Sequence, residues 1–148
     1  MFQKVLQYAS LVAMVAVAYM TLDIVWLGFL MKDFYQTQIS VLLMGNENTY
    51  SLNWVLTLVI WGLVSLGQVF LVRPNGKESL FYAILYGGLY GLIVYGVFDL
   101  TNQSMIAKWP VALSIVDIFW GVTLNSIIGG GMYTVENIIS RSLQEETH

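Results

Sequence analysis

The stretch at residues 80–100, LFYAILYGGLYGLIVYGVFDL, decides the fold of this chain. Asp99 is its only charged side chain, and all the other residues are apolar, aromatic or glycine. A helix of about 20 apolar residues is long enough to cross the hydrocarbon core of a bilayer. The stretch therefore predicts a transmembrane helix.

Three further runs have the same character, and none of them alternates in the way a barrel strand does. Helices are expected because lipid cannot satisfy open backbone groups. We predict an all-α membrane protein, a bundle of four transmembrane helices within a single domain at 1–139. The helices are expected at about 5–30, 54–72, 80–100 and 110–133, followed by a polar C-terminal tail at 140–148.

The composition supports the same class and excludes several others. Of the 148 residues 57% are hydrophobic and 10% are charged, whereas soluble domains carry about 25% charged residues. The net charge is -3 and no basic patch is present, so nucleic acid is not an expected partner. The chain has no cysteine and its only histidine is His148, which excludes thiolate metal sites, haem ligation and a Ser-His relay within the helices. We therefore expect no metal site and no cofactor.

The connections carry their own signals. Residues 73–77, RPNGK, predict a tight turn between the second and third helices, and Pro110 suits the first turn of the fourth. The longest connection, 31–53, is expected to contain a short interfacial helix and then an exposed turn at 46–48. The apolar face of that helix would be formed by Phe34, Tyr35, Ile39, Leu42 and Leu43.

The basic residues predict the orientation. Lys32 and Lys108 fall on one side of the membrane, and the other side carries Lys4, Arg73, Lys77 and Arg141. Because loops rich in Lys and Arg stay in the cytoplasm, both termini are expected to be cytoplasmic.

Three aspartates interrupt the apolar runs, and the helical rise of about 1.5 Å per residue places them at one depth. Asp23 and Asp99 lie near the ends of the outward-going helices, and Asp117 lies seven positions after Pro110 on an inward-going one. All three fall in the outer third of the membrane, where a charged Asp costs up to about 2.5–3.5 kcal/mol. Candidate ligand-binding or proton-linked residues are therefore Asp23, Trp26, Asp99, Asn102, Asp117, Trp120 and Asn125.

Some of these residues also have a structural interpretation. Asp23, Asp99 and Asn102 can be solvated residues at helix ends, and Asp117 can be a neutral residue that joins two helices. Tyrosines stand one turn before two of the aspartates, in Tyr19-x-x-x-Asp23 and Tyr95-x-x-x-Asp99, where each hydroxyl can donate to its Asp. The repeated spacing leaves open a duplication of a two-helix unit.

Glycines along the third helix bear on packing. Gly87 and Gly91 lie one turn apart and favour close helix packing, and they also leave a homo-oligomer open.

Three motifs resemble the DUF2177 family of bacterial membrane proteins. They are LDIVWLG at 22–28 followed by Phe34-Tyr35, then FDLTN at 98–102 with Phe98 in place of the usual Tyr, and KWP at 108–110 leading to VDIFWG at 116–121. The resemblance implies four transmembrane helices and a multi-pass location in the inner membrane. It implies no established activity, since the family is uncharacterised.

The polar cluster leaves three kinds of function open. The first is binding or transport of a small molecule or cation, with the aspartates holding the cation or a proton and the tryptophans forming the walls. The second is a membrane-embedded enzyme of lipid or envelope metabolism that uses Asp99 or Asp117 as its acid or base. The third is an accessory subunit of a membrane complex. The first is preferred, and a catalytic role is the less favoured reading.

Overall fold

A computed structural model of the chain describes residues 2–39 and 53–145, and within these ranges it contains helices and turns but no strand. In this part of the chain four helices are long and apolar enough to cross a membrane. They are Val5–Leu30, Trp54–Gly76, Leu80–Met105 and Val111–Ser142. The predicted all-α fold with four transmembrane helices is confirmed.

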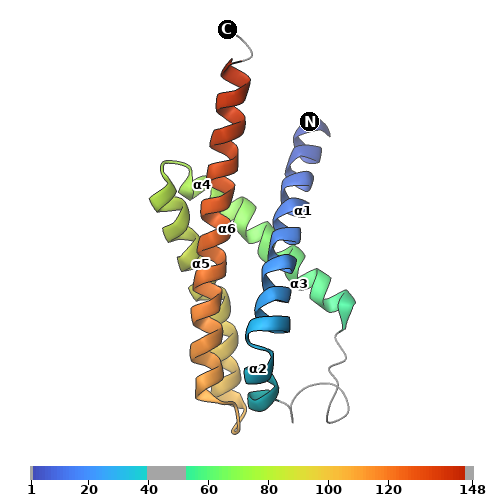
Figure 1. Ribbon diagram of the computed structural model, residues 1–148, viewed down its shortest axis with the longest axis vertical. Helices are drawn as coiled ribbons and strands as arrows, with labels where there is room; N and C mark the ends of the chain where they lie inside the picture. Colours follow the sequence, from blue (N-terminus) through green and yellow to red (C-terminus); the bar gives the residue numbers. More distant parts are fainter. Residues whose placement is uncertain (1, 40–52, 146–148) are drawn as a thin grey trace.

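The four spans run alternately in opposite directions (Figure 1). Both termini lie at one end of the molecule, which we call the terminal end, and α2 lies at the other, the α2 end. The elements in chain order are α1 (Phe2–Val25), the π-helix η1 (Trp26–Leu30), α2 (Lys32–Ile39), α3 (Trp54–Gly67), the π-helix η2 (Gln68–Val72), α4 (Arg73–Gly76), α5 (Leu80–Met105) and α6 (Val111–Glu145).

Helices α5 and α6 form a close antiparallel pair because glycines remove the side chains between them. A Cβ atom added to Gly91 would lie 2.1 Å from the carbonyl oxygen of Gly121, and one added to Gly87 would lie 2.3 Å from that of Asn125. Such small residues let two helix backbones approach closely in a membrane. The face that carries Gly87 and Gly91 is covered by α6 of the same chain. A homo-oligomer stays a prediction, and it would need a different surface.

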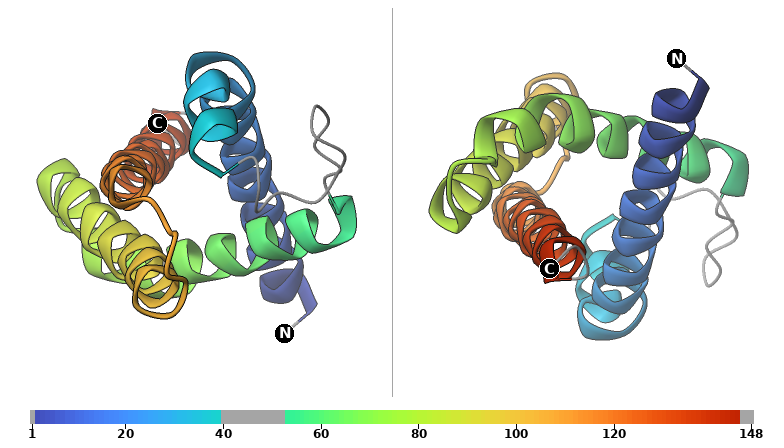
Figure 2. Two further views of the ribbon diagram at one scale, coloured as in Figure 1. Left: turned by 90° about the horizontal axis from the view of Figure 1, so that it is seen from below. Right: turned by 90° about the horizontal axis from the view of Figure 1, so that it is seen from above.

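Helices α1 and α3 pack differently. Figure 2 shows α3 lying steeply across α1, whereas α5 and α6 run side by side. The outer surface is strongly apolar, with Phe29 76% exposed and Val55 70% exposed. Several polar side chains are buried instead, namely Asp23, Ser65, Gln68, Asp99, Ser114 and Asn125. An apolar exterior around a polar interior is the distribution expected of a protein surrounded by lipid.

The segment after α3 differs from the sequence expectation. Instead of turning at 73–77, the chain stays helical through η2 and α4 to Gly76, and the turn is formed by Lys77 and Glu78. Proline inside a helix clashes with the carbonyl four residues earlier. Pro74 stands two residues after the end of the π-helix η2, whose wider turn changes the hydrogen-bond register and makes room for the ring.

Two other boundaries also differ. Helix α6 continues to Glu145, well beyond the expected end at 133, so residues 140–145 of the expected tail are helical. An ion pair between Arg73 of α4 and Glu136 of α6 ties this extension to the second span. Helix α2 carries Phe34 and Tyr35 as expected, while Leu42, Leu43 and the predicted turn at 46–48 lie outside the described residues.

Candidate functional site

Asp23 sits where three helices meet at the α2 end. Its Oδ2 accepts a hydrogen bond of 2.8 Å from the indole N–H of Trp61 on α3, and its Oδ1 accepts one of 3.0 Å from that of Trp120 on α6. Asp23 is 9% exposed and both tryptophans are buried. Because an indole can only donate, the carboxyl group acts as an acceptor on both oxygens. Asp23 therefore joins α1, α3 and α6.

A stacked pair of tryptophans connects Asp23 to a second carboxylate. The rings of Trp26 on η1 and Trp120 on α6 are parallel within 1°, and their centroids are 4.3 Å apart. The Trp26 indole N–H lies 3.4 Å from the hydroxyl of Tyr35, which in turn donates to Oδ1 of Asp117. Trp120 thus faces Asp23 and Trp26 faces the Tyr35–Asp117 pair, so the stack lies between the two carboxylates.

Tyr35 brings α2 against the bundle. Burial raises the pKa of Tyr35, and the neighbouring Asp117 carboxylate raises it further. The hydroxyl therefore keeps its proton at physiological pH and serves as a donor to Asp117. Through this bond the short helix α2 covers the polar residues at the α2 end.

Asp99 is the exception among the three aspartates. It is 0% exposed, and neither of its carboxylate oxygens has a hydrogen-bond partner among the described residues. The side chains of Asp117, Ser114 and Trp109 lie beside its carboxyl group. The Trp109 N–H, however, donates to the hydroxyl of Ser114, at 3.1 Å. Buried polar atoms are nearly always paired, so an unpaired carboxylate in a protein interior calls for an explanation.

Asn125 lies elsewhere, two turns further along α6 towards the middle of the bundle. Its Oδ1 accepts hydrogen bonds from the Tyr19 hydroxyl and, at 2.9 Å, from Nε2 of Gln68. Its own Nδ2 donates to the Gly121 carbonyl at 2.7 Å. These bonds tie α1 and η2 to α6. Asn125 thus belongs to a separate polar junction and not to the aspartate cluster.

The seven candidate residues therefore divide into groups. Asp23, Trp26, Trp120 and Asp117 form one connected network, and Asp99 lies beside Asp117. Asn102, one turn beyond Asp99, is partly exposed, and its side chain makes no hydrogen bond with the residues that the structure describes.

Sequence reasoning missed several members of these networks. Trp61 and Gln68 both lie in the second apolar run, and their polar atoms in an otherwise apolar segment were the available signal. The expected bond from Tyr19 to Asp23 is replaced by the one to Asn125. Side chains on a helix lean towards its N-terminus, so the Tyr19 hydroxyl points away from Asp23 and towards the middle of the bundle.

The fold and the site define a class, namely membrane proteins with four spans, an apolar exterior and an interior of carboxylates, amides and indoles. The chain belongs to the DUF2177 family, whose description is "Predicted membrane protein", and the match covers residues 8–134. This range contains all three motifs on which the resemblance was based, so that resemblance is confirmed. No curated protein and no solved structure matches the chain.

Proposed function

We propose that this membrane protein binds or transports a small molecule or cation at the Asp99–Asp117 pair, and that the pair exchanges a proton in doing so. The supporting observation is the state of Asp99, which is buried with two unpartnered carboxylate oxygens beside a second carboxyl group. A residue that only joined helices would use its acceptors, as Asp23 does.

Electrostatics supports occupancy of the pair by one positive charge. Two unit charges 4 Å apart interact with about 4 kcal/mol even at an effective dielectric constant of 20. Asp99 and Asp117 therefore cannot both be charged without a large cost, and a shared proton or a bound cation removes it. Exchange between these two occupants would couple ligand binding to proton release.

The surroundings suit a gated site. Tyr35 and Trp26 come from α2 and η1, which are tied to the bundle by hydrogen bonds and stacking. Movement of α2 would uncover Asp117 first and Asp99 behind it. The Trp26–Trp120 stack offers an aromatic wall next to the carboxylates, which suits an organic cation through cation–π attraction.

The alternative functions receive less support from the contacts. An enzyme acting on lipid needs its acid or base to touch a bulky substrate, and the carboxyl group of Asp99 is enclosed. An accessory subunit would hold polar groups in reserve for a partner chain. Here the Asp23 and Asn125 networks find their partners within the chain, and the unpartnered Asp99 is 0% exposed, so it is not presented at a surface where a partner chain could reach it.

We place the terminal end in the cytoplasm of a bacterium and the aspartates near the outer face of its inner membrane. Arg73, Lys77 and Arg141 lie towards the terminal end, against Lys32 and Lys108 at the α2 end. This asymmetry supports cytoplasmic termini. A reporter fused to the C-terminus and active only in the cytoplasm tests the orientation, and a reporter active only outside would reverse it.

The function is tested on vesicles that contain the purified protein, fused to a supported membrane. A jump in pH should displace charge as the pair takes up or releases its proton, and Asp99→Asn and Asp117→Asn should reduce this current to that of empty vesicles. Asp33→Asn is the matched control, because Asp33 is exposed in the first turn of α2 and lies outside the cluster.

Ligand binding is tested on the same preparations with sodium, potassium and tetramethylammonium ions. A bound cation should change the fluorescence of Trp26 and Trp120 in the wild type and in Asp33→Asn, but not in Asp99→Asn. Currents and fluorescence responses that survive in folded Asp99→Asn would refute the proposal.

A further inference from the structure

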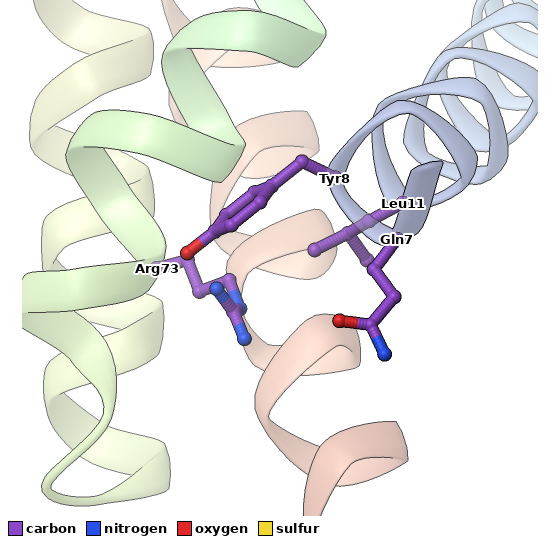
Figure 3. A pocket seen from close by; sticks show the side chains of 4 residues that line it. All are labelled: Gln7, Tyr8, Leu11 and Arg73. Carbon is purple, nitrogen blue, oxygen red and sulfur yellow. The ribbon is translucent and has the colours of Figure 1, made fainter. Parts of the chain in front are cut away.

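A second polar feature lies at the terminal end, far from the aspartates. A pocket of about 240 Å³ opens between α1 and the start of α4 and is lined by Gln7, Tyr8, Leu11 and Arg73 (Figure 3). Gln7 and Tyr8 are exposed and lie in the second turn of α1, and Arg73 lies near the end of the second span. The pocket is therefore at the depth where a membrane protein meets lipid headgroups.

Arg73 is held in place but keeps free donors. Its Nε–H donates to Oε1 of Glu136, and its guanidinium lies 5.8 Å from the centroid of the Tyr8 ring. Tyr8 in turn stacks on Phe70 at 5.3 Å. A guanidinium has five N–H donors in a planar fork. Its Nε–H is used by Glu136 and the Tyr8 hydroxyl also lies beside the guanidinium, so donors on the two terminal nitrogens remain for a ligand.

The remaining walls complement this charge. Figure 3 shows the amide of Gln7 and the guanidinium of Arg73 on either side of the same space. Leu11 adds an apolar wall, and Phe70, 52% exposed beside Tyr8, continues the apolar surface towards the lipid. A ligand that fits has an anionic, hydrogen-bond-accepting head and an apolar tail.

We propose that this pocket binds the phosphate group of an anionic phospholipid. Arginine binds phosphate through two parallel N–H bonds, and the Gln7 amide would supply a further donor to the same group. The acyl chains would lie along Leu11 and Phe70. Glu136 competes with the phosphate for Arg73, so removing its charge should strengthen lipid binding while removing the ion pair.

The test measures lipid retained by the protein, by native mass spectrometry after extraction from vesicles of equal parts phosphatidylglycerol and phosphatidylcholine. The wild type should retain phosphatidylglycerol in preference. Arg73→Gln should lower that preference about fivefold, the usual contribution of one basic residue at an anionic surface. Glu136→Gln should raise it. Gln7→Leu should lower it without touching the ion pair, and it carries the test if Arg73→Gln does not fold.

Arg141→Gln is the matched control, since Arg141 is an exposed basic residue on α6 near the same end but outside the pocket. It should leave the preference unchanged. An equal loss in Arg141→Gln would mean diffuse surface attraction and would overturn the proposal, as would unchanged retention in both Arg73→Gln and Gln7→Leu. Displacement of phosphatidylglycerol by excess inorganic phosphate would identify a soluble phosphate as the ligand and would overturn the lipid assignment.

Discussion

Asp23 and Asp99 are residues of the same type, both buried and both near the α2 end, yet their surroundings are opposite. Each carboxylate oxygen of Asp23 accepts a hydrogen bond from an indole N–H, and the two indoles come from different helices. Neither carboxylate oxygen of Asp99 accepts a hydrogen bond from a described residue, and the neighbouring group is the second carboxyl group, that of Asp117. The first arrangement uses a carboxylate to position helices. The second leaves a carboxylate available for a proton or a ligand.

The difference arises from the helices that surround each residue. Asp23 stands at the open crossing of α1 and α3, where there is room for two large indole rings. Asp99 lies in the pair α5–α6, where the neighbouring Trp109 N–H donates to Ser114 and not to the carboxylate. Asp99 is thus enclosed without a hydrogen-bond partner for either carboxylate oxygen among the described residues.

The largest expected effect contrasts these two residues directly. Asp23→Leu leaves two buried indole N–H groups unpaired, which should lower the free energy of unfolding by about 2–6 kcal/mol at roughly 1–3 kcal/mol per donor. Asp99→Leu removes a buried carboxyl group that has no partner and should be neutral or stabilising. Unfolding in mixed micelles followed by helical circular dichroism measures both. Equal losses in the two variants would contradict the division of roles.

A somewhat smaller effect is expected when the enclosure of Asp99 is opened. Gly91→Ala places a Cβ 2.1 Å from the Gly121 carbonyl oxygen, so α5 and α6 must separate. Overpacking of this kind costs about 1–3 kcal/mol. The separation should also admit water to Asp99, seen as faster modification of Asp99 by a water-soluble carbodiimide, while Asp23 stays protected.

Gly96→Ala is the control for this variant. Gly96 lies on the same helix as Gly91, but a Cβ added to it would meet nothing within 4 Å. It should keep Asp99 protected, and its stability should equal or exceed that of the wild type, since Ala is the better helix former. Loss of protection in Gly96→Ala as well would show that packing at Gly91 does not enclose Asp99.

The contribution of the Trp61–Asp23 hydrogen bond to stability can be measured with a double-mutant cycle. Trp61→Phe should cost about 1–2 kcal/mol in the wild type, where it removes a hydrogen bond to a carboxylate. In the Asp23→Leu background the loss should be much smaller, because the N–H has already lost its partner. Trp54→Phe, at the exposed start of α3, should have no effect in either background. A full cost in both backgrounds would show that Trp61 acts through packing alone.

The sequence predicted the depth of the three aspartates along their helices well, but it predicted their hydrogen-bond partners poorly. The helical rise gave the depth of each Asp along its helix, and the structure places all three near the α2 end. The rotation of each helix depends on packing with its neighbours, so the partners were not readable. Tyr19 was paired with Asp23 by spacing, but the lean of its side chain takes its hydroxyl to Asn125. The donors of Asp23 come from residues 38 and 97 positions away.

Helix ends show the same limitation. Hydropathy located the four spans, but residues 73–77 were interpreted from the turn preference of Pro, Asn and Gly. The chain instead stays helical through a π-helix that ends two residues before Pro74 and buries Gln68 and Val69, and such burial in the bundle cannot be read from local turn preference. The extension of α6 likewise carries a contact that no local pattern announces, the ion pair between Glu136 and Arg73, 63 positions away.

The smallest expected effect concerns the hydrogen bond that Asp117 accepts, because losing it would make Asp117 more like the unpartnered Asp99. Tyr35→Phe removes the hydroxyl that donates to Asp117 and keeps the ring. Because Asp117 is only partly buried, water can replace the lost donor, and the cost should be about 0.5–1 kcal/mol. Tyr82→Phe, whose exposed hydroxyl makes no hydrogen bond within the described ranges, is the control.

The same variant separates covering the site from forming it. If Tyr35 only holds α2 over the carboxylates, Tyr35→Phe should keep the full charge movement after a pH jump but reach it faster, since α2 is less firmly tied. Asp117→Asn should instead abolish the movement. A Tyr35→Phe current as small as that of Asp117→Asn would show that the hydroxyl belongs to the proton-binding group, and the site would then consist of three residues that act as one.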